Sequence, residues 1–192
     1  MKTILSLAFA IFIMAGTGYA QTASFGIKGG LNVYNIHNSN NVVYDPVIGF
    51  HAGGLVHVHL TKSFALQPEV TVSTVGADYK SGPFETRYDL VYINTPLLFQ
   101  YMFNNGLRMQ AGPQVSFLVD AKTRAGNIKE NVRSDFNSVD FGLTTGASYQ
   151  VPKTGFGFDA RYNFGLTNIN SNGSVTSNNR GFQAGIFYLF HR

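Results

Sequence analysis

The sequence predicts an all-β protein, an eight-stranded antiparallel up-and-down transmembrane β-barrel. Eight stretches alternate apolar and polar residues, which places the apolar side chains of each stretch on one face of a strand. The connections between these stretches alternate between long and short, as they do in transmembrane barrels. The composition agrees, because only 12% of the residues are charged, whereas 14% are aromatic and 21 residues are glycine. Such a composition is unlike that of a disordered chain or a helical bundle.

The start of the chain has the features of a secretory signal peptide. Lys2 supplies a positive charge, an apolar stretch of export length follows over 4–15, and Gly18 and Ala20 are the small residues that precede a cleavage site. No stop-transfer pattern follows, so a retained transmembrane helix is the weaker alternative. We therefore divide the chain into a signal peptide, 1–20, and an outer membrane β-barrel domain, 21–192.

Cysteine content and charge exclude several classes of protein. The chain contains no cysteine, so neither disulfides nor thiolate metal sites hold it together. Its net charge of +4 falls by one when Lys2 leaves with the signal peptide. The remaining positive charge is small and scattered, which excludes a nucleic-acid partner.

The first half of the barrel consists of four expected strands. These are 24–34, 47–60, 64–73 and 89–103. The third strand follows the second after a short turn at 61–63, so the two form a hairpin. The connections 35–46 and 76–88 interrupt the alternation with Asn, Gly, Ser and Pro, and they are predicted to be loops. Pro96 lacks a donor N–H, so we expect it at a bulge or at a weakly paired position.

The second half of the barrel supplies four more strands. These are 107–119, 139–150, 156–165 and 179–192. An Asn-Gly turn within 104–106 favours a tight hairpin, and 151–155 forms another short turn. The connections 120–138 and 166–178 are predicted to be long loops. An even number of strands that begins with a long loop places both termini on the periplasmic side.

The closing strand contains an aromatic face that ends close to the C-terminus. The side chains expected to face lipid are those of Phe182, Ala184, Ile186, Tyr188 and Phe190. Gln183 and Gly185 face the lumen on the opposite side of the strand. Phe187 and Leu189 share that inward parity, and we expect them to plug the periplasmic end.

Alternation alone does not decide which face of the barrel is outside. A soluble lipocalin-like barrel that binds a ligand would place the apolar face inside. Strands of about ten residues or more favour a membrane span, and so does an apolar face too rich in aromatic residues for a narrow interior. The polar faces also carry charges: Lys28, Glu69, Arg108, Asp140, Asp159 and Arg161. Facing lipid near the midplane, each would cost up to ~4 kcal/mol, whereas inside the lumen they can pair. We therefore expect a lumen charge network that seals the barrel, and no wide diffusion pore.

Several short segments occur in an order that spans the whole mature chain. They are GIKGGLN at 26–32, LQPE at 66–69, YINTPLL at 92–98, Gly112-Pro113, Asp140 with Gly142, DARY at 159–162 and GLTNI at 165–169. Together they resemble the PorT-like outer membrane β-barrel family of Bacteroidota. The resemblance implies recognition by the outer membrane assembly machinery through a terminal aromatic signal, here Tyr188 and Phe190. The chain departs from that pattern because His191 and Arg192 follow Phe190. Members of the family take part in protein secretion and gliding, which makes a secretion-associated role one possibility.

Histidines provide the only metal hypothesis in the sequence. His57 and His59 are two residues apart on the polar face of the second strand, so they could share a metal ion near the periplasmic end. No carboxylate is close in sequence. The alternative is that both histidines line the lumen or its rim. We expect no bound cofactor.

The long loops are the expected functional part of the molecule. We expect a structural, adhesion or envelope-accessory role, with outer membrane lipids, lipopolysaccharide and an envelope or secretion protein as partners. The loop 120–138 mixes basic and acidic residues, so it either binds lipopolysaccharide phosphates or is simply a solvated loop. A lipid A-modifying enzyme is a further alternative. No strand presents Ser and His in a catalytic pattern, so we expect no enzyme and name no catalytic residue.

Overall fold

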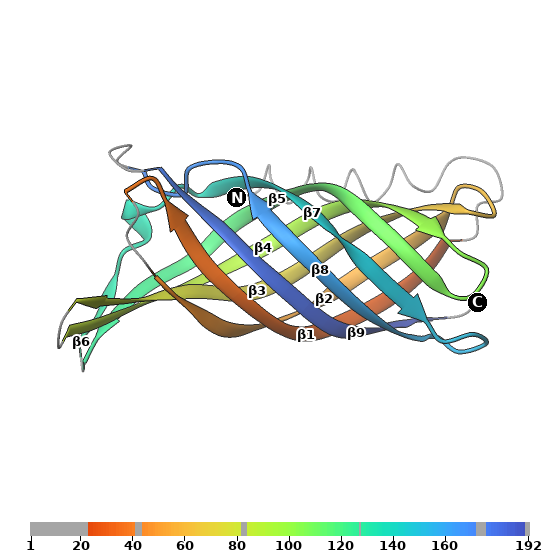
Figure 1. Cartoon of the computed structure of the whole chain (residues 1–192), viewed down its shortest axis with the longest axis horizontal. Coiled ribbons are helices and arrows are strands. Elements are labelled where there is room, and N and C mark those ends of the chain that lie inside the picture. The colour runs from red at the N-terminus through yellow and green to blue at the C-terminus, as the bar shows by residue number, and fades with distance from the viewer. Residues whose placement is uncertain (1–22, 41–43, 82–83, 127, 172–175, 191–192) are drawn as a thin grey trace.

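The protein is a single closed barrel of eight antiparallel strands (Figure 1). The computed structural model describes residues 23–40, 44–81, 84–126, 128–171 and 176–190. The barrel strands are β1 (Ala23–Asn38), β2 (Asp45–His59), β3 (Phe64–Ser81), β4 (Phe84–Met102), β5 (Leu107–Ala125), β7 (Val139–Gln150), β8 (Phe156–Gly165) and β9 (Ser177–Leu189). Each strand pairs with the next, and β9 pairs with β1 to close the wall. The predicted fold class is confirmed.

Two features lie outside this set of barrel strands. The short strand β6 (Ile128–Asn131) and the 3-10 turn Arg133–Asp135 belong to the connection between β5 and β7. Within the described residues, no helix is long and apolar enough to cross a membrane. The predicted signal peptide, 1–20, lies outside the described residues.

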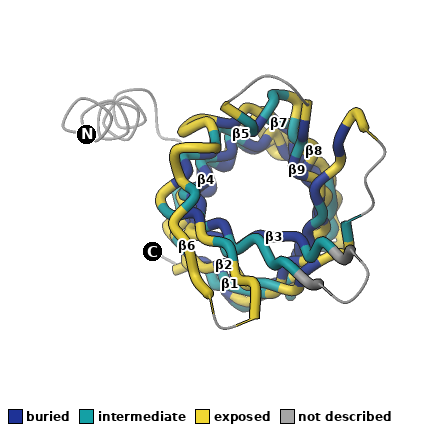
Figure 2. Tube along the Cα trace, turned by 90° about the vertical axis from the view of Figure 1, so that its left-hand side faces the viewer, coloured by how far each residue is buried: buried dark blue, intermediate teal, exposed yellow. Residues whose placement is uncertain are grey.

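The outer wall is apolar and the lumen is polar. Figure 2 shows buried and exposed positions alternating along the strands. Side chains such as Ile48, Leu31 and Phe99 are 70%, 63% and 58% exposed, whereas polar residues on the opposite face are buried. This arrangement confirms that the apolar faces point outward. The soluble lipocalin-like alternative is wrong, because such a surface would expose a continuous apolar belt to water.

The two ends of the barrel differ. The short turns lie at one end, which we call the turn end, and the long connections lie at the other, the loop end (Figure 1). The first described strand begins at the turn end and β9 finishes there, because Gly26 pairs with Leu189. Both described ends of the chain therefore lie at the turn end.

The predicted loop 76–88 is wrong, because most of it is a long hairpin. The β3–β4 ladder runs without interruption from Thr71↔Asn94 to Ser81↔Phe84. Apolar alternation ends there because this part of the hairpin lies beyond the apolar belt, where Asp78 and Arg87 replace aliphatic residues. Backbone pairing continues nonetheless, as far as Ser81↔Phe84.

The predicted loop 120–138 is also partly strand. β5 continues to Ala125 and pairs with β6, from Lys122↔Asn131 to Ala125↔Ile128. Four strand segments thus lie side by side beyond the barrel wall: 76–81 of β3, 84–90 of β4, 120–125 of β5 and all of β6. We call this the extension sheet, and it projects at the left of Figure 1.

Pro96 lies where the strand pairing is weakest. The β3–β4 ladder has a gap between Pro68↔Leu97 and Thr71↔Asn94. The β4–β5 ladder has another gap, between Pro96↔Gln114 and Phe99↔Ala111. The expected weak pairing is confirmed, while the register shift lies elsewhere, between Val91 and Tyr92.

Apolar clusters close the lumen at both ends. At the turn end, Phe187 and Leu189 face inward, as predicted, and pack against Leu55. The loop end has two clusters: Tyr34, Val75, Leu90, Tyr92, Leu118 and Ala121 form one, and Ile36, Ala77 and Ile169 form the other. Phe136, from the connection between β5 and β7, packs against both of these clusters.

Candidate functional site

Four charged side chains meet in the middle of the lumen. Inward parity brings Lys28 from β1, Glu69 from β3, and Asp159 and Arg161 from β8 into one place. Lys28 Nζ lies 3.1 Å from Asp159 Oδ2 and 3.4 Å from Glu69 Oε2. Arg161 Nη1 and Nη2 donate to the two carboxylate oxygens of Glu69 at 2.8 and 3.1 Å. Arg161 Nε is also 2.8 Å from Asp159 Oδ2. We call these four residues the ionic cluster.

The ionic cluster is electrically balanced and buried. Its two cations match its two anions, and all four residues are buried. The Gln67 side-chain amide donates to Glu69 Oε1 at 2.7 Å, which satisfies a further carboxylate lone pair. Buried charges are tolerated only with such pairing, because desolvation costs several kcal/mol per ion. The cluster therefore fills the middle of the lumen with side chains that are held in place by ion pairs and hydrogen bonds to one another.

Two of the six predicted network residues lie apart from the cluster. Arg108, the second residue of β5, donates a hydrogen bond to the side-chain oxygen of Gln150 near the turn end. Asp140, the second residue of β7, accepts a hydrogen bond from Thr167 at 2.6 Å near the loop end. Both face the lumen, but their positions along the strands place them at opposite ends. The single six-residue network is a wrong expectation, because parity fixes the face of a residue but not its depth.

The two candidate metal ligands are neighbours at the turn end. The rings of His57 and His59 pack edge to face with centroids 4.6 Å apart. His57 is buried and His59 is exposed. Among the described residues, no group of three or more His, Cys, Asp or Glu side chains is placed to hold a metal ion. Edge-to-face packing provides a structural role for the pair.

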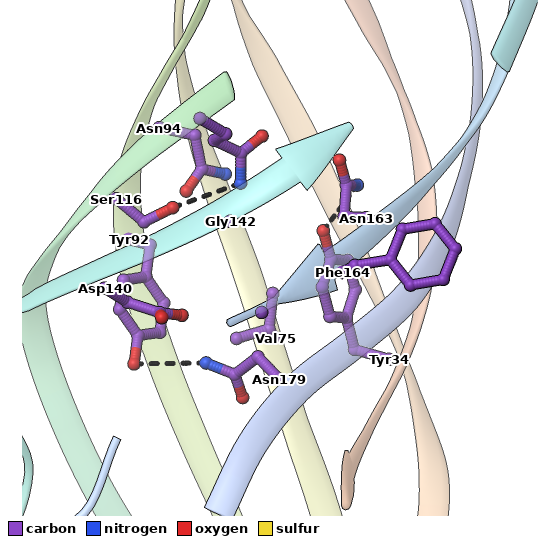
Figure 3. A pocket seen from close by; sticks show the side chains of 12 residues that line it. Tyr34, Val75, Tyr92, Asn94, Ser116, Asp140, Gly142, Asn163, Phe164 and Asn179 are labelled. Carbon is purple, nitrogen blue, oxygen red and sulfur yellow. Dashed lines mark hydrogen bonds between the residues drawn. The ribbon is translucent and has the colours of Figure 1, made fainter. Parts of the chain in front are cut away.

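A polar cavity lies between the ionic cluster and the apolar clusters of the loop end. Figure 3 shows Tyr34, Tyr92, Asn94, Ser116, Asp140 and Asn179 among the side chains that line it. Asn163 donates to the phenol oxygen of Tyr34 at 2.7 Å, and Asn179 donates to that of Tyr92 at 3.3 Å. Sequence reasoning did not single out the two tyrosines. The signal was present, because Tyr34 has the same parity as Lys28 on β1.

Two connections cover the mouth at the loop end. Residues 132–138, which follow β6, meet residues 166–171, and we call these two segments the lid. Phe136 forms a bridge with Asn170, and the Asn137 backbone N–H donates to the Ile169 carbonyl at 2.7 Å. The Asn137 side chain donates to the carbonyls of Asn168 and Asn170 at 2.9 and 3.1 Å. These bonds hold the two segments together across the opening.

Charged residues occupy the outward face of the extension sheet. Arg124 Nε lies 2.6 Å from Asp89 Oδ2, and Arg87 Nε donates to the other oxygen of Asp89 at 3.0 Å. Lys122 contacts Asp120 at 2.5 Å. The basic side chains remain 41–51% exposed, so these pairs contribute little to stability. Their donors remain accessible to a ligand.

The expected assembly signal lies at the end of β9. Tyr188 packs against Phe156 and Phe190, with ring centroids 4.7 and 5.4 Å away. Phe190 is 48% exposed on the outer wall, and its N–H donates to the Phe25 carbonyl at 2.7 Å. His191 and Arg192 lie outside the described residues.

Comparison with protein families agrees with this architecture. The pattern of the family described as "Outer membrane protein beta-barrel domain" matches residues 19–171. The chain belongs to this family. It is therefore an outer membrane β-barrel protein. No curated protein matches the sequence.

Solved outer membrane barrels have the same fold. Neisserial surface protein A superposes with a TM-score of 0.59 at 18% identity, covering 88% of this chain and 99% of that one. Ail, the attachment invasion locus protein of Yersinia pestis, in complex with the heparin analogue sucrose octasulfate, gives 0.53 at 11% identity and the same coverage. OprG of Pseudomonas aeruginosa gives 0.52 at 14% identity, covering 90% and 98%. At these identities the likeness shows the fold of the outer membrane barrel and nothing finer.

Proposed function

We propose that this outer membrane protein is a sealed barrel that acts through its loop end, in adhesion or as an envelope-accessory protein. The observation that carries the proposal is the closure of the lumen. The ionic cluster fills its middle and apolar clusters close both ends. A barrel without a path for solutes must act through its surface. The extension sheet and the lid lie beyond the apolar outer wall, so they are the parts of that surface that partners outside the membrane can reach.

The proposal includes an orientation. In barrels of this kind the long connections are extracellular and the short turns are periplasmic. We accordingly place the loop end outside the cell and both termini in the periplasm. The variant Ile128→Cys tests this orientation, because Ile128 is 64% exposed on β6. A membrane-impermeant thiol reagent should label the introduced cysteine on intact cells. Labelling only after the outer membrane is permeabilised would contradict it.

We propose phosphate-rich lipopolysaccharide headgroups as the ligand of the extension sheet. Arg87, Lys122 and Arg124 lie on its outward face next to the apolar belt, where neighbouring lipid headgroups are found. Guanidinium and ammonium groups bind phosphate through charge-assisted hydrogen bonds. Ail, another barrel of this fold, has been solved in complex with sucrose octasulfate, which is a polyanion.

Binding to lipopolysaccharide is measured with the barrel in phosphatidylcholine nanodiscs at two salt concentrations. The Lys122→Ala/Arg124→Ala variant should bind several-fold more weakly than the wild type, with a shallower salt dependence. Lys62→Ala/Lys153→Ala, which removes two exposed basic residues at the turn end, is the matched control. Equal binding by all three proteins would refute the headgroup site.

The resemblance to PorT-like barrels supports a finer proposal, a secretion-associated envelope partner at the loop end. A photo-crosslinking residue at Ile128 captures such a partner in intact outer membranes, and pull-down after solubilisation identifies it. The same residue at Lys62 is the control. Recovery of only the assembly machinery from both positions would contradict a partner at the loop end.

The enzymatic alternative is tested by the mass of lipid A. We expect that mass to be unchanged when the protein is expressed. The described polar groups of the lumen are packed inside the barrel, away from the lipid that a lipid A-modifying enzyme must reach. A new lipid A species that depends on expression would favour the enzyme.

A further inference from the structure

We propose that the polar cavity beneath the lid is a binding site for one small monovalent cation, such as sodium or potassium, held by the carboxylate of Asp140. Nothing in the family relationship assigns a ligand to this cavity. The proposal is independent of what binds to the outer surface, and it rests on charge, position and the chemistry of the lining.

Asp140 is a buried acid whose charge has no counterpart nearby. Its side chain is 6% exposed. Its polar neighbours are neutral: the Thr167 hydroxyl, which donates to Oδ1 at 2.6 Å, and the Asn179 side chain. Among the described residues, no Lys, Arg or His lies within ion-pair distance of Asp140. An uncompensated carboxylate in such a place is costly, and a bound cation removes that cost while the carboxylate stays ionised, whereas a bound proton would neutralise the group instead.

The charges of the lumen do not supply that counterpart. Lys28 and Arg161 are both neutralised by Glu69 and Asp159 within the ionic cluster. Arg108 is the remaining inward cation of the predicted set, but it lies eight residues along β5 from Ser116, the strand partner of Asp140. At about 3.3 Å per residue this separates Arg108 from Asp140 by roughly 26 Å.

The lining of the cavity beside Asp140 includes several side-chain oxygen atoms, next to apolar groups such as Val75 and Phe164. The Ser116 hydroxyl, the Tyr92 phenol and the Asn94 side-chain amide line it together with the carboxylate (Figure 3). Oxygen atoms of carboxylates, amides and hydroxyls are the ligands of hard cations. The cavity suits an ion with a water molecule rather than an organic molecule. One carboxylate balances a single positive charge, which favours a monovalent ion over calcium.

The site also connects to the lid. Thr167 donates to Asp140 and its hydroxyl oxygen accepts the Phe141 backbone N–H at 2.9 Å. A cation that holds the carboxylate in place therefore also supports the start of the segment 166–171. Binding of the cation to Asp140 should therefore also stabilise the lid at the mouth of the barrel.

The test is equilibrium binding of radioactive sodium and rubidium to the full barrel in phosphatidylcholine nanodiscs at neutral pH, with N-methylglucamine as the inert cation. The wild type should bind one ion per barrel with saturation. Asp140→Asn, which preserves size and removes charge, should weaken binding about tenfold or more. Asp120→Asn removes a partly exposed acid of the extension sheet, so it is the control and should bind like the wild type.

A second variant keeps the test decisive if Asp140→Asn does not fold. Ser116→Ala retains the carboxylate and removes one oxygen ligand, so it should weaken binding several-fold while the barrel migrates as folded protein. No saturable binding by the wild type, or equal binding by wild type and Asp140→Asn, would overturn the proposal. So would selective binding of calcium, and so would an infrared band showing that Asp140 carries a proton in the presence of saturating sodium.

Discussion

Arg161 and Glu69 face each other across the full width of the lumen and are joined at two points. The guanidinium of Arg161 donates from Nη1 and Nη2 to both oxygens of Glu69, at 2.8 and 3.1 Å. β3 and β8 are four strands apart in either direction around the eight-stranded wall, so the pair spans its diameter. A two-point pair of this kind fixes orientation as well as distance. The pair therefore braces two opposite walls of the barrel.

Removing one partner of this brace should be strongly destabilising. We expect Glu69→Gln to lower the free energy of unfolding by about 3–5 kcal/mol, because Lys28 and Arg161 then share a single buried carboxylate. Urea unfolding of the barrel refolded into lipid vesicles measures the change. Asp120→Asn removes a partly exposed acid and should change the same free energy by less than about 0.5 kcal/mol.

A double variant separates the pair from the two single sites. Glu69→Gln/Arg161→Gln leaves Lys28 paired with Asp159, so it should be less destabilised than the sum of the single variants. Additive losses would show that the two side chains do not stabilise the barrel together.

The sealed lumen should not conduct ions. We expect the wild type in planar bilayers to show no sustained conductance, because the ionic cluster and the apolar clusters occupy the interior in series. A variant with alanine at Lys28, Glu69, Asp159 and Arg161 should show brief, small openings where the cluster is lost. Large, stable channels from the wild type would refute the closed barrel.

Gly181 leaves room for the ring of Tyr34. A Cβ atom at Gly181 would lie 2.4 Å from Tyr34 Cγ, so any side chain there displaces the ring. Gly181→Ala should lower the free energy of unfolding by about 1–3 kcal/mol, since the displaced ring also loses its hydrogen bond from Asn163. Gly54→Ala is the control, because its Cβ would meet only the Gly26 carbonyl oxygen, at 3.8 Å. Equal urea midpoints for the two variants would contradict this packing.

The sequence predicts the barrel wall well, because outward positions face lipid and inward positions face the lumen, so apolar and polar residues alternate along each strand. Strands β7 and β8 have the predicted bounds, 139–150 and 156–165, since turn residues or loops flank an apolar alternation at each end. The hairpin of β3 and β4 was missed where it leaves the lipid. There the outward positions become Asp78 and Arg87, and backbone pairing alone continues the strands.

The lumen is harder to predict, because strand parity contains no information on depth. Parity correctly places Lys28, Arg108 and Asp140 inside. Their depths depend on the stagger between neighbouring strands, such as the pairing of Ser116 with Asp140, and no local pattern encodes that stagger. The ionic cluster could be predicted only from the register of all eight strands, because that register decides which inward side chains lie at the same depth.

The lid should depend on Phe136. Phe136 packs against both apolar clusters of the loop end and lies 6.4 Å from the ring of Tyr88. Phe136→Ser should expose the segments 132–138 and 166–171 to protease without unfolding the wall, because local opening needs only the lid contacts to break. Ile128→Ser is the control, since Ile128 is 64% exposed and its loss should leave the cleavage rate unchanged. Identical cleavage of both variants would argue against an anchoring role for Phe136.

The last two residues of the chain should be dispensable for assembly. Phe190 lies on the outer wall with Tyr188 packed beside it, and we expect these two rings to form the assembly signal, while His191 and Arg192 follow Phe190 in sequence. Deleting His191 and Arg192 should leave the amount of folded barrel in the outer membrane unchanged or increase it. Phe190→Ala should reduce that amount, since it removes the aromatic ring itself.

Heat-modifiable migration of outer membrane fractions on gels measures folded protein in each case. Loss of insertion on deleting the two residues would instead assign the signal to the tail.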